Sequence, residues 1–164
     1  TMITISDYTA MLAQLQEIVH EQTAGLSQSE ALIQPPQGGN CMLWVLGHLA
    51  NNLVTIQQKV LGGPLPADLP DLSRFGYGSQ PVLGDEPGLP TLSQLVDSID
   101  KLHAAIAERL ATMREEDFDD EITVIRNRKQ RRGYWALFFF FHQSYHTGQL
   151  EFGRNLAGHT EHVI

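Results

Sequence analysis

Apolar residues recur at intervals of three and four positions in four separate stretches of this sequence, and that spacing places them along one side of an α-helix. The stretches span residues 5–24, 40–61, 91–113 and 134–156. An amphipathic helix is stable only when its apolar stripe is buried against other elements. The pattern therefore predicts an all-α protein in which four long helices share one core.

Capping signals mark where these helices begin. Ser27 and Glu30 have the spacing of a capping box and predict a short extra turn of helix after the first long one. Asn40 is the expected N-cap of the second long helix. Thr91 and Gln94 repeat the capping-box spacing at the start of the third helix, which we expect to end near residue 113.

Two connections differ from the helices in composition. Residues 62–90 hold six of the eight prolines and no regular period, which predicts a long Pro/Gly-rich loop between helices 2 and 3, of the kind that often serves as a lid or binding loop. Residues 114–133 carry an acidic run and then a basic run without an apolar stripe, and we expect an irregular connection that includes a small hairpin.

Charge and composition exclude some classes of protein. The net charge of -8 disfavours a nucleic-acid surface, because phosphate binding depends on lysine and arginine. No apolar run approaches the length that spans a membrane, and the first residues, "TMITISDYTAML", lack a secretory signal. We therefore expect one cytoplasmic domain over residues 2–158 with a C-terminal tail over 159–164, without nucleic-acid or membrane partners.

Three histidines stand out. His142 and His146 are one helical turn apart, so both side chains project from the same side of the last helix. His48 lies on the core-facing stripe of the second helix. A single histidine on such a stripe is more often a hydrogen-bonded core residue, but three imidazoles together indicate a divalent-metal site that keeps open positions for other ligands.

The sequence around these histidines resembles a known family. "LWVLGHLANN" around His48 and "HQSYHTGQL" around His142 and His146 are similar to the two motifs of the DinB-like, damage-inducible metalloprotein superfamily, also called DinB/YfiT-like metalloenzymes. The resemblance implies an antiparallel up-down-down-up four-helix bundle and metal ligation by these three histidines. It also implies nickel or zinc as the metal, with iron or manganese as alternatives, and frequent homodimers.

A homodimer is also suggested by the last helix itself, which is apolar around much of its circumference. The resemblance further implies a transferase or isomerase that uses a low-molecular-weight thiol as cosubstrate and acts on a small electrophile. Two alternatives remain open, a metal-assisted hydrolase of small molecules and a non-catalytic stress protein that binds metal or a small ligand. A peptidase is disfavoured because Gln143 stands where a metalloprotease helix carries its catalytic glutamate.

Other side chains near the motifs are weaker candidates for the site. Gln149 lies one turn beyond His146 and is a candidate to hydrogen-bond a ligand or substrate, or else a polar residue of the inner bundle. Tyr145 is a candidate to stabilise a developing anion, although a helical tyrosine more often serves packing. Asp85 and Glu86 in the long loop have two interpretations: carboxylates that approach the site, or charges that remain solvated.

Cys41 is interpreted as a small buried residue, because it lies about 10 Å along the helix axis from His48. The remaining histidines are expected outside the ligand set. His103 is interpreted as a partly exposed structural residue, His20 falls beside the first stripe, and His159 and His162 belong to the tail.

The basic run from Arg126 to Arg132 carries five positive charges and has two interpretations. It offsets the neighbouring acidic run as a solvated loop, or it binds the carboxylates of a substrate or thiol cosubstrate.

Overall fold

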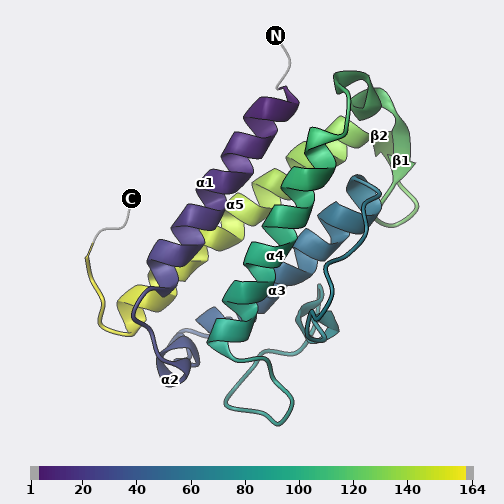
Figure 1. The fold of residues 1–164 in the computed structure, drawn as a ribbon. Coiled ribbons are helices and arrows are strands. Elements are labelled where there is room, and N and C mark those ends of the chain that lie inside the picture. Colours follow the sequence, from purple (N-terminus) through teal and green to yellow (C-terminus); the bar gives the residue numbers. More distant parts are fainter. Residues whose placement is uncertain (1–3, 162–164) are drawn as a thin grey trace.

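The computed structural model describes residues 4–161 and is mostly helical (Figure 1). Four long helices pack side by side, and a short helix, α2, follows the first of them. Their bounds are α1 Ile5–Thr23, α2 Gln28–Ala31, α3 Met42–Thr55, α4 Leu92–Ala111 and α5 Arg132–Leu156.

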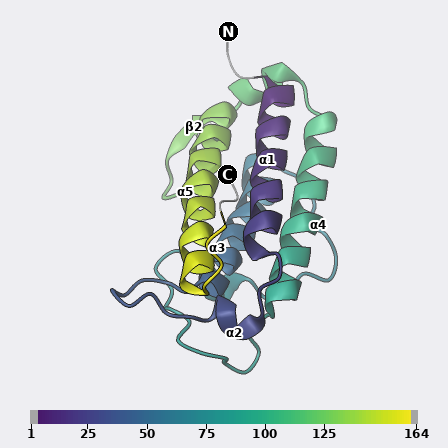
Figure 2. The same cartoon turned by 90° about the vertical axis from the view of Figure 1, so that its left-hand side faces the viewer.

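Each of the helices α1 and α3 packs against both α4 and α5, so the four share one core (Figure 2). The start of α1 contacts the segment that follows α4, where the backbone N–H of Ile5 donates to a carboxylate oxygen of Glu115 at 2.9 Å. At the opposite end, the backbone N–H of Leu92 donates to the side chain of Gln28 at 2.7 Å. These contacts fix α1 and α4 in opposite directions.

The predicted apolar stripes form the core. In α4, the stripe residues are almost fully removed from solvent, and burial of each leucine or isoleucine side chain stabilises the fold by about 1.5–3 kcal/mol. The buried stripe consists of Leu92, Leu95, Ile99, Leu102, Ile106 and Leu110.

Both predicted capping boxes are confirmed. The hydroxyl of Ser27 accepts the backbone N–H of Glu30 at 3.3 Å, and the hydroxyl of Thr91 accepts that of Gln94 at 3.2 Å. The prediction for the second long helix was wrong by one residue. Cys41 is the N-cap of α3 and makes no capping hydrogen bond with its side chain.

The ends of two helices also differ from the prediction. α4 ends at Ala111, two positions before the expected boundary, and α5 begins at Arg132 rather than near residue 134. The early start of α5 follows from Arg132, whose guanidinium donates to the backbone carbonyl groups of Asp117 and Val60 and so fixes the first turn.

The long loop has more structure than its composition predicts. The predicted second helix ends before the loop as a π-helical segment, η1 (Ile56–Val60), and Gly62 then turns the chain with a φ of 67°. A 3₁₀ turn, η2 (Ser73–Phe75), then interrupts the loop, and the Phe75 side chain is completely buried. The loop is therefore anchored in the core at its middle.

The predicted hairpin is confirmed after a 3₁₀ segment, η3 (Glu115–Asp119). Its strands β1 (Glu121–Thr123) and β2 (Lys129–Arg131) are antiparallel. The hairpin is attached to α5 by Trp135, whose indole N–H donates to the carbonyl group of Ile122 at 3.2 Å.

No helix within residues 4–161 is both long enough and apolar enough to cross a membrane. The end of the predicted tail, including His162, lies outside the described residues.

Candidate metal centre

His48 comes from the most buried helix of the protein's core. Nearly every residue in the first three turns of α3 is buried, and the His48 side chain is only 4% exposed. The indole of Trp44, one turn earlier, stacks on the imidazole with the ring centroids 4.8 Å apart and an interplanar angle of 16°. The ring of His48 is thus held from one side by its own helix.

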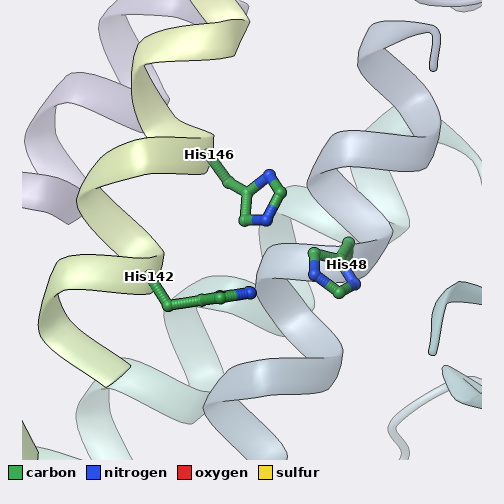
Figure 3. A group of neighbouring side chains, drawn as sticks. All are labelled: His48, His142 and His146. Carbon is green, nitrogen blue, oxygen red and sulfur yellow. The ribbon is translucent and has the colours of Figure 1, made fainter. Parts of the chain in front are cut away.

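His142 and His146 come from α5, where α5 faces α3. Both are partly exposed, and their ring centroids are 4.5 Å apart because one helical turn separates them. The ring centroid of His48 lies 5.1 Å from that of His142 and 4.6 Å from that of His146. The three side chains point toward one another across the space between the helices (Figure 3).

One nitrogen from each of these histidines lies within 4.8 Å of those of the other two. An ion bound to three imidazoles at about 2.0–2.1 Å brings the nitrogens closer together than this, so binding requires the side chains to rotate toward one another. The three histidines expected from the sequence therefore meet in one cluster, and its geometry is compatible with a bound divalent ion.

Hydrogen bonds determine which ring nitrogens remain available. The Nδ1 atom of His48 lies 2.7 Å from the carbonyl oxygen of Phe75, and because that oxygen can only accept, Nδ1–H is the donor. Nδ1 of His146 lies 2.8 Å from the amide oxygen of Gln149 in the same relationship. Both rings are left with an Nε2 lone pair, the form in which imidazole binds metals.

The pKa values favour the same form. The pKa of His142 is lowered to about 4, chiefly by burial and also by the charges that His146 and His48 carry when protonated. The pKa of His48 is lowered as well, chiefly by burial, although the hydrogen bond to Phe75 opposes the shift. Both rings are neutral at physiological pH. Nδ1 of His142 is buried without a hydrogen-bond partner among the described residues.

Sequence reasoning missed Phe75 and Gly47, which orient His48. A Cβ atom at Gly47 would lie 2.3 Å from the Phe75 ring, so only glycine allows the loop to approach α3 this closely. Trp44 holds the same loop by donating its indole N–H to the hydroxyl of Ser79 at 3.1 Å. A lone phenylalanine among the polar, Gly-rich residues of "SRFGYG" was the available signal that this loop is anchored.

Of the weaker candidates from the sequence, Gln149 and Tyr145 lie beside His146, whereas Cys41 does not. Gln149 contacts His146 directly, and the ring of Tyr145 lies edge-on to that of His146 at 5.2 Å while remaining 61% exposed. Cys41 is buried as expected, with its thiol 3.5 Å from the carbonyl oxygen of Val82, and is outside the cluster.

The loop carboxylates are not part of the histidine cluster either. Glu86 pairs with Arg74 at 3.3 Å, and Asp85 is exposed.

The remaining described histidines have other environments. His103 was expected to be partly exposed, but it is buried, because it faces the core between α4 and the other helices. His20 pairs with Asp100 at 2.7 Å, and His159 with Glu30 at 3.2 Å.

Gln143 points away from the cluster. Its amide N–H donates to the carbonyl group of Leu49 at 3.1 Å, and the side chain is buried between α5 and α3. A glutamate at this position would therefore not face the histidines as a general base.

Comparison with known proteins identifies the family and the fold. A family model described as the DinB superfamily matches residues 11–150. A crystal structure of a conserved protein from Enterococcus faecalis has the same fold, with a TM-score of 0.70 at 19% sequence identity over 96% of this chain and 98% of the other. A search of the curated proteins finds no match.

Proposed function

This chain belongs to the DinB superfamily, and from that premise we propose that it is a divalent-metal-dependent enzyme whose ligands are His48, His142 and His146. The observation that carries the proposal is the convergence of three imidazoles, two of them with Nδ1 already bonded to an acceptor. Imidazole nitrogen suits zinc, nickel, copper and iron alike. The family resemblance favours nickel or zinc, with iron and manganese as further candidates.

The reaction we propose is transfer of a low-molecular-weight thiol to a small electrophile, or an isomerisation that uses such a thiol. A divalent ion in this site supplies Lewis acidity, which lowers the pKa of a bound thiol or water. His48 and His146 are held in position by Phe75 and Gln149, while the exposed hydroxyl of Tyr145 is available to stabilise a developing anion.

The metal assignment is tested by elemental analysis of untagged protein purified without chelator or metal-affinity resin. We expect about one divalent ion per chain, lost in His48→Ala and His142→Ala. His20→Ala is the matched control, because His20 is exposed and pairs with Asp100, and it should retain the metal. A wild-type protein that contains no ion and does not take up added zinc or nickel would overturn the assignment.

The reaction is tested on the metal-loaded protein with a panel of thiols and electrophiles. Thiol-dependent loss of the electrophile, abolished in His142→Ala, is the expected result. Metal-dependent ester or amide cleavage without thiol would instead identify a hydrolase. Metal binding without either activity would identify a non-catalytic binding protein.

The proposal extends to architecture and assembly. We propose a single domain over residues 2–158 with the up-down-down-up order of its long helices, supported by the guanidinium of Arg154 in α5, which donates to the carbonyl group of Ala24 at the end of α1. A cytoplasmic location is part of the proposal, since small thiols are kept reduced there.

A homodimer through α5 is also proposed. Large apolar side chains on this helix are exposed at intervals of four residues, a pattern that favours burial against a second subunit. They are Leu137, Phe141 and Tyr145, with Phe152 further along the helix. A protein that sediments as a monomer at micromolar concentration would contradict this assembly.

A further inference from the structure

The basic run of the hairpin divides into two groups of residues. Three of its five cations each pair with a carboxylate of the preceding acidic run. Lys129 and Arg131 are exposed, as the solvated-loop interpretation expects, whereas the side chain of Arg132 is only 15% exposed. The pairs are Lys129–Glu121 at 2.7 Å, Arg131–Asp119 at 3.1 Å and Arg132–Asp120 at 3.3 Å. Within residues 4–161, the guanidinium groups of Arg126 and Arg128 have neither an ion pair nor a hydrogen bond.

Each of these two guanidinium groups lies over an aromatic ring instead. Cζ of Arg126 is 5.9 Å from the ring centroid of Tyr77, and Cζ of Arg128 is 5.0 Å from that of Tyr134. A cation–π contact of this kind does not use the N–H donors of the guanidinium. The donors of both arginines therefore remain available for two-point binding of a carboxylate.

The aromatic rings connect these arginines to the histidine cluster. The ring of Tyr134 stacks on Phe138, and Phe138 on His142, with centroids 6.4 Å apart in both pairs. Tyr134 and His142 are two helical turns apart, about 12 Å along the axis of α5.

The second arginine is linked to the cluster through the long loop. Tyr77 follows two positions after Phe75, whose carbonyl group binds His48. Arg126 and Arg128 thus lie beyond the same end of the cluster, and both are exposed.

Arg126 has an unfavourable backbone conformation in the turn. Its φ is 49°, where hairpins normally use glycine or asparagine, whereas Asn127, with a φ of 56°, is a residue that suits this region. A left-handed conformation at an arginine costs about 1–2 kcal/mol. An arginine in a strained conformation at an exposed turn is consistent with a role outside folding.

We infer that Arg126 and Arg128 bind the carboxylate groups of an elongated anionic ligand whose other end reaches His48, His142 and His146. This deepens the proposed function and rests on it for the position of the metal-binding end. A thiol of about tripeptide length that carries carboxylates has the required chemistry, because its anionic groups can lie near the hairpin while its sulfur lies at the cluster.

The inference is tested by calorimetric titration of zinc-loaded protein with glutathione and with glutathione diethyl ester, which keeps the thiol but lacks both free carboxylates. Glutathione should bind about 10-fold more tightly than the diester, and Arg126→Gln and Arg128→Gln should each weaken glutathione binding about 10-fold. Arg131→Gln is the matched control, since Asp119 already neutralises that arginine, and it should change the affinity less than about 2-fold.

Arg126→Gly separates binding from folding. Glycine tolerates the positive φ at this position, so the variant should melt at the same temperature as the wild type or higher while binding glutathione more weakly. Equal affinities for glutathione and its diester, or equal losses in Arg131→Gln and Arg128→Gln, would overturn the inference.

A measurement without metal keeps this inference distinct from the metal assignment. In metal-free protein, the side-chain Nε–H signals of Arg126 and Arg128 in a ¹⁵N correlation spectrum should shift on addition of glutathione, while that of Arg131 should not. If these shifts appear but the protein does not take up added zinc or nickel, the arginine site is supported and only the metal proposal is overturned. Metal binding without the shifts would overturn the arginine site alone.

Discussion

The Nδ1–H of His48 donates a hydrogen bond of 2.7 Å to the carbonyl oxygen of Phe75, which lies 27 residues later in the chain. This contact links a buried helix to the middle of the long loop. It fixes both the tautomer and the orientation of the imidazole, and second partners of this kind change metal affinity when they are lost.

Gly47→Ala tests the contribution of this contact. The added Cβ would lie 2.3 Å from the Phe75 ring, so the loop must move away and draw its carbonyl group from His48. We expect metal affinity to fall about 10–100-fold, with a loss of about 1–3 kcal/mol in unfolding free energy from overpacking. Competition with a chromophoric chelator measures the affinity, and urea unfolding measures the stability.

Gly148→Ala is the matched control for that variant. No atom lies within 4 Å of a Cβ built at Gly148, which is also in a helix and close to His146. Its metal affinity should be unchanged and its stability higher by up to about 1 kcal/mol, because alanine favours the helix. If Gly47→Ala were destabilised but bound metal as tightly as the wild type, Phe75 would have no part in positioning His48.

Gln149 provides a second test of ligand positioning. Its amide oxygen accepts from Nδ1 of His146 at 2.8 Å, and Gln149 is exposed, so substitutions should not affect folding. Gln149→Met removes the acceptor and should weaken metal binding about 10-fold, whereas Gln149→Glu keeps an acceptor and should retain the affinity. If Gln149→Met bound metal as tightly as the wild type, Gln149 would have no part in positioning His146.

The sequence predicted that the three histidines meet, because helical spacing alone places His142 and His146 on one side of their helix, and the stripe of α3 places His48 in the core. It did not predict Phe75, since no local pattern says where the middle of a proline-rich loop docks. The N-cap at Cys41 was missed for a related reason. Burial of α3 overrides the preference for asparagine at that position, and helix boundaries depend on such tertiary contacts.

Gln143→Glu tests why this helix carries glutamine beside its first histidine. The substitution replaces a donor to the Leu49 carbonyl with a buried carboxylate, which should lower the unfolding free energy at pH 8 by about 3 kcal/mol. Burial raises the pKa of the new carboxyl group, so the variant should recover part of this stability relative to the wild type as the pH falls to 5. No peptidase activity should appear.

Gln143→Met is the control for that prediction. It removes the hydrogen bond without adding a charge, so its loss of stability should be about 1 kcal/mol and independent of pH. An equal, pH-independent loss in both variants would mean that the cost of Gln143→Glu comes from packing rather than from charge.

His103 should make the stability of the protein depend on pH. Burial in the core lowers its pKa from an ordinary value of 6.5 to about 4, so the unfolded chain binds a proton more readily than the folded protein between these values. The stabilising contribution is complete above pH 6.5 and is lost as the pH falls toward 4, amounting to about 2 kcal/mol at pH 5. Urea unfolding of metal-free protein at pH 7.5 and pH 5.0 measures this change in unfolding free energy.

His103→Leu and His103→Gln are the controls, because both lack the titrating group. Between pH 7.5 and pH 5.0, the unfolding free energy of each should fall by about 2 kcal/mol less than that of the wild type, whatever the absolute stability of the variant. Equal losses in all three proteins would show that His103 is not the group that the folded state keeps neutral.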